Sequence, residues 1–396
     1  MHRLFLLVPF LVGSCALRAA SPTAPQNAST SPLEPVASST PAAAKAEAPS
    51  TEESESETDD QPVVEEAESR EPAADGAPDG PRYTEDLSDE DLQEKWKSAP
   101  EALGCISIGF ADEGRLINAE QFPPGDDWIV VSPGQTWATP ETVSYVAAAI
   151  RNVRARHPHA PRLRVNQMSA REGGYLRPHK SHQSGRDVDL GFYYPTEEPV
   201  RVREREKRID VALNWELVKS LVTLTDVQMI LVDRRVQKVL YEYALRTGED
   251  KDWLDSLFRS EKPLVQHARR HRDHFHVRFY SPRSQELGRR VAPLLAQRPE
   301  QNVATHRVRK GDTLGGIARR YGSSVESLRK VNHMRGSFLR LSQVLRVPLK
   351  GPCTRCPVPP PLVVPPRRLP PAAQAEEVAG SAPKSDRAGA TVLGRP

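Results

Sequence analysis

Two stretches decide how this chain folds: His179-Lys-Ser-His-Gln-Ser-Gly-Arg-Asp-Val-Asp189 and His271-Arg-Asp-His-Phe-His-Val-Arg278. Each ends in alternating polar and apolar residues, a pattern that predicts a β-strand. Successive side chains of a strand point to opposite faces, so His274, His276 and Arg278 share one face and leave the other to the apolar residues between them. The second stretch therefore predicts a strand with one face for a hydrophobic core and one face of imidazole groups.

The first stretch has the same two-faced pattern. Asp187 and Asp189 share one face, and Val188 and Leu190 share the other. Imidazole and carboxylate groups are ligands of divalent metals, and zinc is the first candidate for such a set. We therefore expect the two polar faces to form a Zn2+ site on a sheet.

Catalytic zinc is held by three protein ligands and keeps a fourth position open for water. We expect His182, Asp189 and His276 to be those ligands, because they combine two neutral imidazoles with one carboxylate. His274 lies two residues before His276 on the same strand face, where it is expected to act as the base that accepts a proton.

Further polar residues flank the expected ligands. His179 and His271 each precede a site histidine by three residues, and they are expected to stabilise an oxyanion or to orient the substrate. Asp187 is either a hydrogen-bond partner of a ligand imidazole or a residue that only adds solubility. Asp273 is expected as a further partner of an imidazole N–H group.

The sequence around these stretches mixes helices and strands without regular alternation. Thr139 is expected to cap a helix that ends before His157, and Asn214 is expected to cap a second helix. A strand is expected at Val227–Val232, followed by a helix at Val236–Leu245. This pattern predicts an α+β fold with an antiparallel sheet and flanking helices.

The segment from Gly104 to Pro282 resembles the penicillin-insensitive murein endopeptidases, metallopeptidases of the group that includes lysostaphin-type and D-Ala-D-Ala enzymes. The resemblance is carried by Leu116-Ile-Asn-Ala-Glu-Gln-Phe122, by Thr139-Pro-Glu-Thr-Val143 and by both histidine stretches. It places a peptidase domain at residues 83–285 and implies zinc as its cofactor.

The resemblance implies the same three ligands, the same base and the same supporting histidines as the residue pattern. The implied reaction is hydrolysis of the D-alanyl–meso-diaminopimelyl cross-links of peptidoglycan. The matching residues expected to bind the substrate are Gly173, Gly174, Gln183 and Arg186.

The N-terminus has the features of an export signal. Arg3 precedes the apolar run Leu4–Val12, and small residues follow it. The run is too short to span a bilayer, so residues 1–20 are predicted to be a signal peptide.

This signal peptide could be processed in two ways. Val12-Gly-Ser-Cys15 resembles a bacterial lipobox, in which Cys15 would carry a lipid and become the new N-terminus. The alternative is ordinary cleavage near Ala19 or Ala20, which would discard Cys15. Either route predicts an exported, periplasmic protein, and lipidation would make it an outer-membrane lipoprotein of a Gram-negative bacterium, held to the membrane only by that anchor.

Composition separates linkers from folded regions. Residues 21–82 are rich in Ala, Pro, Ser and Glu and lack the apolar residues that offset the entropy of ordering, so they are predicted to be a disordered linker. Residues 284–301 are polar and are expected to form a link between domains. The net charge of +3 gives no electrostatic case for a nucleic-acid partner.

Residues 304–349 resemble a LysM domain. The sequence predicts a βααβ unit in which Thr313 caps the first helix and Ser323, in a capping box with Glu326, caps the second. The resemblance implies binding to peptidoglycan glycan strands that contain N-acetylglucosamine. The residues expected to contact the glycan are Gly311, Asp312 and Thr313.

Residues 350–396 are rich in proline, which favours an extended, flexible and disordered tail. Within it, Cys353 and Cys356 are expected to form a local disulfide, because an exported protein matures in an oxidising compartment. Cys105 is the competing partner for either sulfur.

These expectations combine into one function and two alternatives. The chain is predicted to be a zinc-dependent endopeptidase that cuts peptide cross-links of peptidoglycan and is brought to the wall by its LysM domain. One alternative keeps the zinc site but makes the protein a D,D- or L,D-carboxypeptidase that trims single stem peptides. The other is a catalytically inactive, wall-binding lipoprotein.

Overall fold

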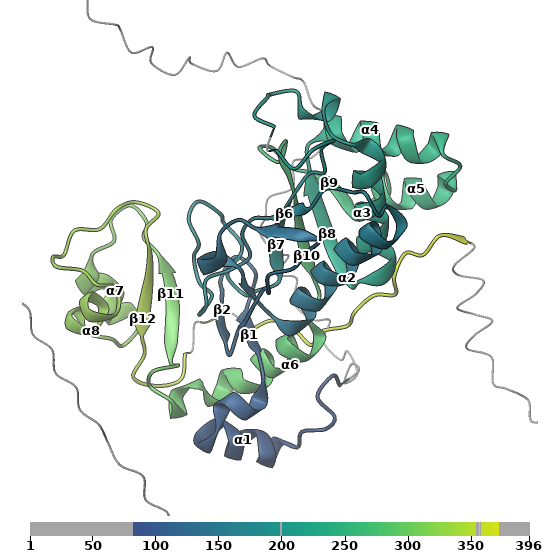
Figure 1. The fold of residues 1–396 in the computed structure, drawn as a ribbon. Coiled ribbons are helices and arrows are strands. Elements are labelled where there is room, and N and C mark those ends of the chain that lie inside the picture. The colour runs from purple at the N-terminus through teal and green to yellow at the C-terminus, as the bar shows by residue number, and fades with distance from the viewer. Residues whose placement is uncertain (1–81, 199, 354–355, 357, 372–396) are drawn as a thin grey trace, which may run out of the picture. The chain divides into compact units, whose positions relative to one another are not determined.

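The computed structural model describes residues 82–198, 200–353, 356 and 358–371 (Figure 1). The predicted signal peptide at 1–20, its lipobox, nearly all of the predicted linker at 21–82 and the chain beyond residue 371 lie outside the described residues. Within the described part of the chain, no helix combines the length and the apolar composition required to cross a bilayer.

A six-stranded sheet forms the centre of the larger domain. Its strands lie in the order β4 (Trp128–Val130), β6 (Leu163–Val165), β7 (Asp187–Gly191), β10 (His274–Phe279), β8 (Val227–Val232) and β9 (Val265–His267). The four central strands pair antiparallel, as predicted. The two edge pairs, β4 with β6 and β8 with β9, are parallel, so the sheet is mixed.

The two histidine stretches supply neighbouring strands at the centre of this sheet. His276 lies opposite Asp189, and Arg278 lies opposite Asp187. Directly opposed residues of an antiparallel pair have their side chains on the same face, so imidazoles and carboxylates meet there. The apolar residues of β10 occupy the other face, where all three are fully buried in the core: Phe275, Val277 and Phe279.

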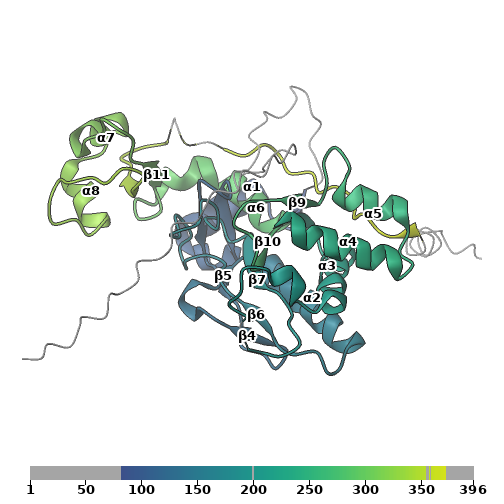
Figure 2. The same cartoon turned by 90° about the horizontal axis from the view of Figure 1, so that it is seen from above.

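Four helices contribute to the core on the apolar side of the sheet (Figures 1 and 2). They are α2 (Pro140–Arg156), α3 (Val211–Leu224), α4 (Arg234–Arg246) and α5 (Lys251–Phe258). The predicted cap of α2 is confirmed, because the Thr139 hydroxyl accepts a hydrogen bond from the backbone N–H of Thr142 at 3.2 Å. The predicted strand at 227–232 also matches β8.

The predicted cap of α3 is wrong. Asp210 caps this helix, and its carboxylate accepts a hydrogen bond from the N–H of Leu213 at 3.0 Å. Asn214 lies inside the helix and is fully buried. Its side-chain amide donates to the carbonyl of Tyr193 and accepts from the N–H of Tyr193, at 2.8 and 3.0 Å. Asp and Asn are equally good caps, so the tertiary contact with Tyr193 decides between them.

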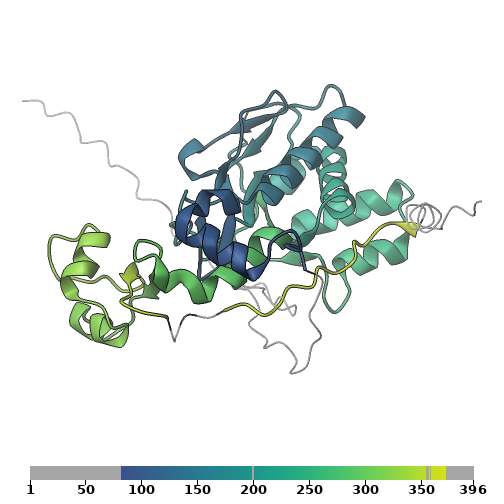
Figure 3. The ribbon, with the colours of Figure 1, turned by 90° about the horizontal axis from the view of Figure 1, so that it is seen from below.

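A smaller cluster joins the two ends of the larger domain (Figure 3). It combines α1 (Asp89–Ser98), the hairpin of β1 (Ile106–Gly109) and β2 (Gly114–Ile117), α6 (Pro282–Val291) and the 3-10 helix η4 (Ala292–Gln297). The remaining short elements are η1 (Pro100–Leu103), η2 (Pro133–Gln135), η3 (Arg205–Lys207) and the paired strands β3 (Glu120–Gln121) and β5 (Trp137–Ala138).

The expected polar link at 284–301 is therefore corrected. Most of it is helical, and Leu287 and Val291 are buried against the N-terminal helix. These two residues are four apart, which places them on one face of a helix. The Trp96 indole N–H also donates to the carbonyl of Leu294 at 2.9 Å. The four-residue spacing of Leu287 and Val291 indicates this helix, although the composition of the segment is polar.

The smaller domain has the predicted βααβ order. It consists of β11 (Val303–Arg307), α7 (Leu314–Arg320), α8 (Val325–Val331) and β12 (Val344–Pro348). Thr313 caps α7, as predicted. Ser324 rather than Ser323 caps α8, since the Ser324 hydroxyl accepts from the N–H of Ser327 at 3.0 Å. Ser324 has the extended backbone that a cap requires.

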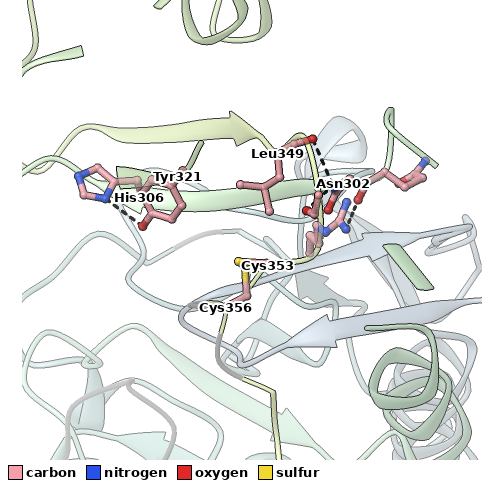
Figure 4. Close-up of a disulfide and its surroundings, with 9 residues drawn as sticks. Asn302, His306, Tyr321, Leu349, Cys353 and Cys356 are labelled. Carbon is pink, nitrogen blue, oxygen red and sulfur yellow. Dashed lines mark hydrogen bonds between the residues drawn. A yellow bond between two sulfur atoms is a disulfide. The ribbon is translucent and has the colours of Figure 1, made fainter. Parts of the chain in front are cut away.

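The cysteines pair as expected. Cys353 and Cys356 form a disulfide (Figure 4), and both pack against the core of the smaller domain. Cys105 is a free, buried thiol, and its burial raises its pKa to about 12. A thiol with so high a pKa is a poor competitor in disulfide exchange.

Two leucines of α3 test the core assignment. Leu217 is fully buried, whereas Leu224 is 41% exposed. We expect Leu217→Ala to lower the free energy of unfolding by about 2–5 kcal/mol, because it leaves a cavity. We expect Leu224→Ala to change it by less than about 0.5 kcal/mol. All five tryptophans lie in the larger domain, so denaturation followed by tryptophan fluorescence reports this domain. Equal losses in both variants would contradict the assignment.

Candidate metal centre

The candidate metal centre lies on the polar face of β7 and β10. Asp187 and Asp189 come from β7, and His274 and His276 come from β10. His182 comes from the loop that precedes β7 and has a φ of 65°, in the left-handed region that non-glycine residues rarely adopt. Such a backbone persists only where its surroundings enforce it, and this is common at functional sites.

Three side-chain atoms form a compact triangle. His182 Nε2 and His276 Nδ1 each lie 3.2 Å from Asp189 Oδ1, and they lie 3.3 Å from each other. Tetrahedral zinc, with bonds of about 2.0–2.2 Å, requires ligand atoms about 3.3 Å apart. The three residues are almost completely buried. The triangle therefore has the size that a single zinc ion needs.

The hydrogen bonds of the two imidazoles orient them toward the centre of this triangle. His182 Nδ1 lies 2.6 Å from the carbonyl of Met168, and His276 Nε2 lies 3.0 Å from Asp187 Oδ1. Each acceptor takes the N–H of its ring and leaves the other nitrogen with a lone pair. Asp189 Oδ1, although buried, accepts no hydrogen bond of good geometry from any described residue. A cation bound to the three atoms would satisfy this oxygen.

Asp187 is a hub of the site. Besides His276, it accepts hydrogen bonds from Arg278 Nε at 2.6 Å and from the backbone N–H of His182 at 3.2 Å. Burial alone would raise the pKa of Asp187, but the charge of Arg278 and the hydrogen bond from His276 hold the pKa far below its ordinary value. Asp187 is thus a buried carboxylate that pairs with the imidazole of His276, as in the first of the two roles expected for it.

Ionised carboxylates also control the histidines of β10. Burial would lower the pKa of His276, but its hydrogen bond to Asp187 and the nearby charge of Asp189 raise that pKa to about 10. An imidazole must lose this proton before it can bind a metal through that nitrogen. The pKa of Asp189 is held well below its ordinary value, because the charges of His182 and His274 outweigh the effect of burial.

His274 stands beside the triangle and is more accessible than its members. Its Nε2 lies 3.6 Å from Asp189 Oδ1, and its Nδ1 lies 2.7 Å from Asp273 Oδ1. Asp273 therefore fixes the ring so that Nε2 faces the site, as expected for a partner of an imidazole N–H group. Burial would lower the pKa of His274, but the charge of Asp189 and the hydrogen bond to Asp273 raise it above its ordinary value.

The two supporting histidines also lie at the site. The His271 ring is 4.9 Å from that of His274, and its Nδ1 lies 3.0 Å from the carbonyl of Arg269. His179 Nδ1 lies 3.6 Å from Asp189 Oδ2, and its ring is 4.4 Å from that of His182. The structure thus brings together all five histidines of the two stretches.

Two sets of three residues could hold the metal. In the second set, His179 joins His182 and Asp189, and one ligand atom of each lies within 4.8 Å of the others. His276 suits the third ligand position better than His179. Its Nδ1 lies 3.2 Å from Asp189 Oδ1, whereas His179 Nδ1 lies 3.6 Å from Asp189 Oδ2. His276 Nδ1 also lies 3.3 Å from His182 Nε2, the separation expected between two ligand atoms of one zinc ion. His179 is also partly exposed, which suits a residue that contacts substrate.

The residues expected to bind substrate in this domain have structural contacts. A side chain at Gly173 would collide with the backbone of Gln183 and Arg115. The amide nitrogen of Gln183 donates to the carbonyls of Asp112 and Lys180 at 2.7 and 2.9 Å. Arg186 is fully buried. Gly174, by contrast, has open space where a side chain would be.

The residues expected to contact glycan in the smaller domain also shape their loop. Gly311 has a φ of 89°, which favours glycine. Asp312 Oδ2 lies 2.8 Å from both His306 Nε2 and the N–H of Arg309. Thr313 uses its hydroxyl to cap α7. The backbone of Gly311 and the side chains of Asp312 and Thr313 therefore shape this loop.

Sequence reasoning missed two contributors to the site. The Met168 carbonyl orients His182, and no sequence signal could identify it, because every residue has a carbonyl. Arg205 Nη2 lies 3.8 Å from Asp273 Oδ2 and so supports the partner of His274. It lies in a segment of alternating charges that gave no sign of which charge would face the site.

Comparison with known proteins agrees with this geometry. Residues 107–297 match the model of the penicillin-insensitive murein endopeptidase family, and residues 306–348 match the model of the LysM domain. Among curated proteins, no sequence is significantly similar to the chain. The first match ends at the last residue of η4, which agrees with the packing of α6 and η4 in the peptidase domain. The chain therefore has a peptidase domain of the penicillin-insensitive murein endopeptidase family, followed by a LysM domain.

Proposed function

We propose that the protein is a zinc-dependent endopeptidase that hydrolyses the D-alanyl–meso-diaminopimelyl cross-links of peptidoglycan. The observation that carries the metal assignment is the triangle formed by His182 Nε2, Asp189 Oδ1 and His276 Nδ1, with separations of 3.2–3.3 Å. The family of the peptidase domain supports murein as the substrate. The presence of a LysM domain supports attachment to the same polymer.

In this proposal, each side chain has one task. His182, Asp189 and His276 hold the ion, and the carbonyl of Met168 and the carboxylate of Asp187 orient the two imidazoles. When bound, zinc supplies Lewis-acid polarisation of the scissile carbonyl and activation of a water molecule. The chain's own residues supply everything else, namely positioning and proton transfer.

Proton transfer falls to His274. Its Nδ1 is engaged by Asp273, and its Nε2 faces Asp189, so this nitrogen can accept a proton from the attacking water. The same nitrogen can then return the proton to the departing amine. His271 and His179 flank this position on either side and are suited to hydrogen-bond the developing oxyanion or the peptide.

Location at the cell wall completes the proposal. The N-terminal sequence supports export to the periplasm, with Cys15 as the site of a possible lipid anchor to the outer membrane. The LysM domain would bind N-acetylglucosamine-containing strands and keep the peptidase near its substrate. A single tether to the polymer raises the local concentration of cross-links around the site.

Digestion of purified sacculi tests the reaction. We expect the full-length protein to convert cross-linked muropeptide dimers to monomers, and we expect chelation to abolish the conversion and added zinc to restore it. Chromatography and mass spectrometry of the muropeptides identify the products, and elemental analysis gives the zinc content. Release of terminal D-alanine alone would establish the carboxypeptidase alternative instead, and full activity of zinc-free protein would refute the metal assignment.

Replacement of His274 separates the enzyme from the non-enzymatic alternative. We expect His274→Ala to reduce cross-link cleavage by about 10²–10⁴-fold, because it removes the proton acceptor. Zinc content and sacculus binding should remain, since His274 is not one of the three ligands. An unchanged cleavage rate would remove His274 from the mechanism. Sacculus binding without chelator-sensitive cleavage by the unaltered protein would favour a wall-binding lipoprotein.

The role of Asp187 is tested by metal affinity. We expect Asp187→Asn to weaken zinc binding by about 10–100-fold, because Asp187 holds the His276 ring with Nδ1 toward the metal. Competition with a chromophoric chelator measures this affinity, and circular dichroism shows whether the variant is folded. The matched control is Asp252→Asn, at an exposed position of α5. Equal affinity of a folded Asp187→Asn variant would show that His276 does not need this partner.

A further inference from the structure

The proline-rich segment that follows the LysM domain contacts the peptidase domain. Residues 358–371 form no strand and only residue 371 is helical, and the yellow end of the ribbon runs back to α5 in Figure 2. The N–H of Val364 donates to the Tyr83 hydroxyl at 3.1 Å. The segment borders a groove whose other walls are the loop after α5, the start of β8 and Tyr280. A tail of this composition was expected to be free.

Arg368 is held in a socket on α5. Its guanidinium donates to the carbonyl of Ser256 at 2.5 Å and to the carbonyl of Lys262 at 2.7 Å. In return, the indole N–H of Trp253 donates to the carbonyl of Arg368 at 2.7 Å. Ser256 lies in the last turn of α5, where a cation also interacts favourably with the helix dipole. Both the side chain and the backbone of Arg368 are therefore recognised.

The preceding arginine has a different partner. Arg367 Nε lies 2.9 Å from Asp226 Oδ1, and the other oxygen of Asp226 accepts a hydrogen bond from the Tyr145 hydroxyl at 2.6 Å. Tyr145 thus orients the Asp226 carboxylate independently of the tail. Because adjacent arginines bind different elements, a shift of the segment by one residue would break both sets of contacts. The docking therefore has a defined register.

The LysM domain lies between two attachments to the peptidase domain. Its first connection is the short stretch from η4 to β11, residues 298–302. Its entry and exit are tied together, because the N–H of Leu349 donates to the carbonyl of Asn302 at 2.8 Å and the side-chain amide of Asn302 donates to the carbonyl of Leu349 at 3.1 Å (Figure 4). The chain then returns to the peptidase domain at Val364. Adjacent entry and exit are typical of a domain inserted into a loop of another.

We propose that residues 363–369 form a strap that holds the LysM domain to the peptidase domain by a second attachment. One short connection limits distance but allows rotation about itself, whereas two connections restrict rotation as well. The strap thus limits the directions in which the LysM domain can present a glycan strand. This consequence rests on the proposed function, since it matters only if the two domains act on one polymer. The docking itself does not depend on that function.

The test compares three full-length proteins: the unaltered chain, the double variant Arg367→Ala/Arg368→Ala, and the charge-matched control Arg201→Ala/Arg203→Ala, whose arginines are exposed. Hydrogen exchange over residues 362–369 and nitrogen relaxation of the LysM amides are measured. We expect exchange at least about tenfold faster in the strap variant only, because it loses several hydrogen bonds to charged groups. We also expect the LysM domain of this variant to reorient faster relative to the peptidase domain. Equal exchange or equal tumbling in all three proteins would overturn the proposal.

Two additions keep the result decisive. Trp253→Phe removes the indole donor to Arg368 but keeps an aromatic ring, and it should give an intermediate increase in exchange; no increase would count against the socket. Cleavage of a soluble muropeptide dimer should be the same in all the proteins, because the strap does not touch the metal centre. If none of them cleaves the dimer, the proposed function fails, while exchange and relaxation still decide the strap.

Discussion

His276 lies opposite Asp189 across two antiparallel strands, and Arg278 lies opposite Asp187 two residues further along. The candidate metal centre depends on this register, because a shift by one residue would turn one set of groups to the other face of the sheet. The register is held by the apolar residues of both strands, which are buried in the core on the opposite face. The packing of the core therefore also brings the residues of the site together.

The electrostatics of the site follow from that register. Asp187 and Asp189 are both buried, and a buried charge is costly unless it is paired. Arg278 and the N–H groups of two histidines satisfy Asp187. Asp189 keeps an oxygen without a hydrogen bond of good geometry from the described residues, at equal distances from two imidazole nitrogens. The fold thus completes the pairing of one carboxylate and leaves the other directed at a position suited to a cation.

The architecture outside the sheet joins parts that are distant in sequence. Helices α1 and α6 close the peptidase domain by packing its two ends together. The strap would extend this arrangement beyond the LysM domain, with Arg368 and Trp253 as its main contact. Under this proposal, the wall-binding domain is an insertion between two anchored segments. The peptidase and its binding domain would then search the wall as one body with limited internal rotation.

The sequence by itself determined the local features of this protein. Alternation placed the imidazoles and carboxylates on one face, the residue types indicated zinc, and the motifs identified both families. Tertiary structure alone decided the features that depend on distant partners. It selected Asp210 over Asn214 as a cap, made the Met168 carbonyl a partner of His182 and docked Arg368 on α5. Carbonyls and exposed arginines occur throughout any sequence, so only the folded chain determines which of them meet.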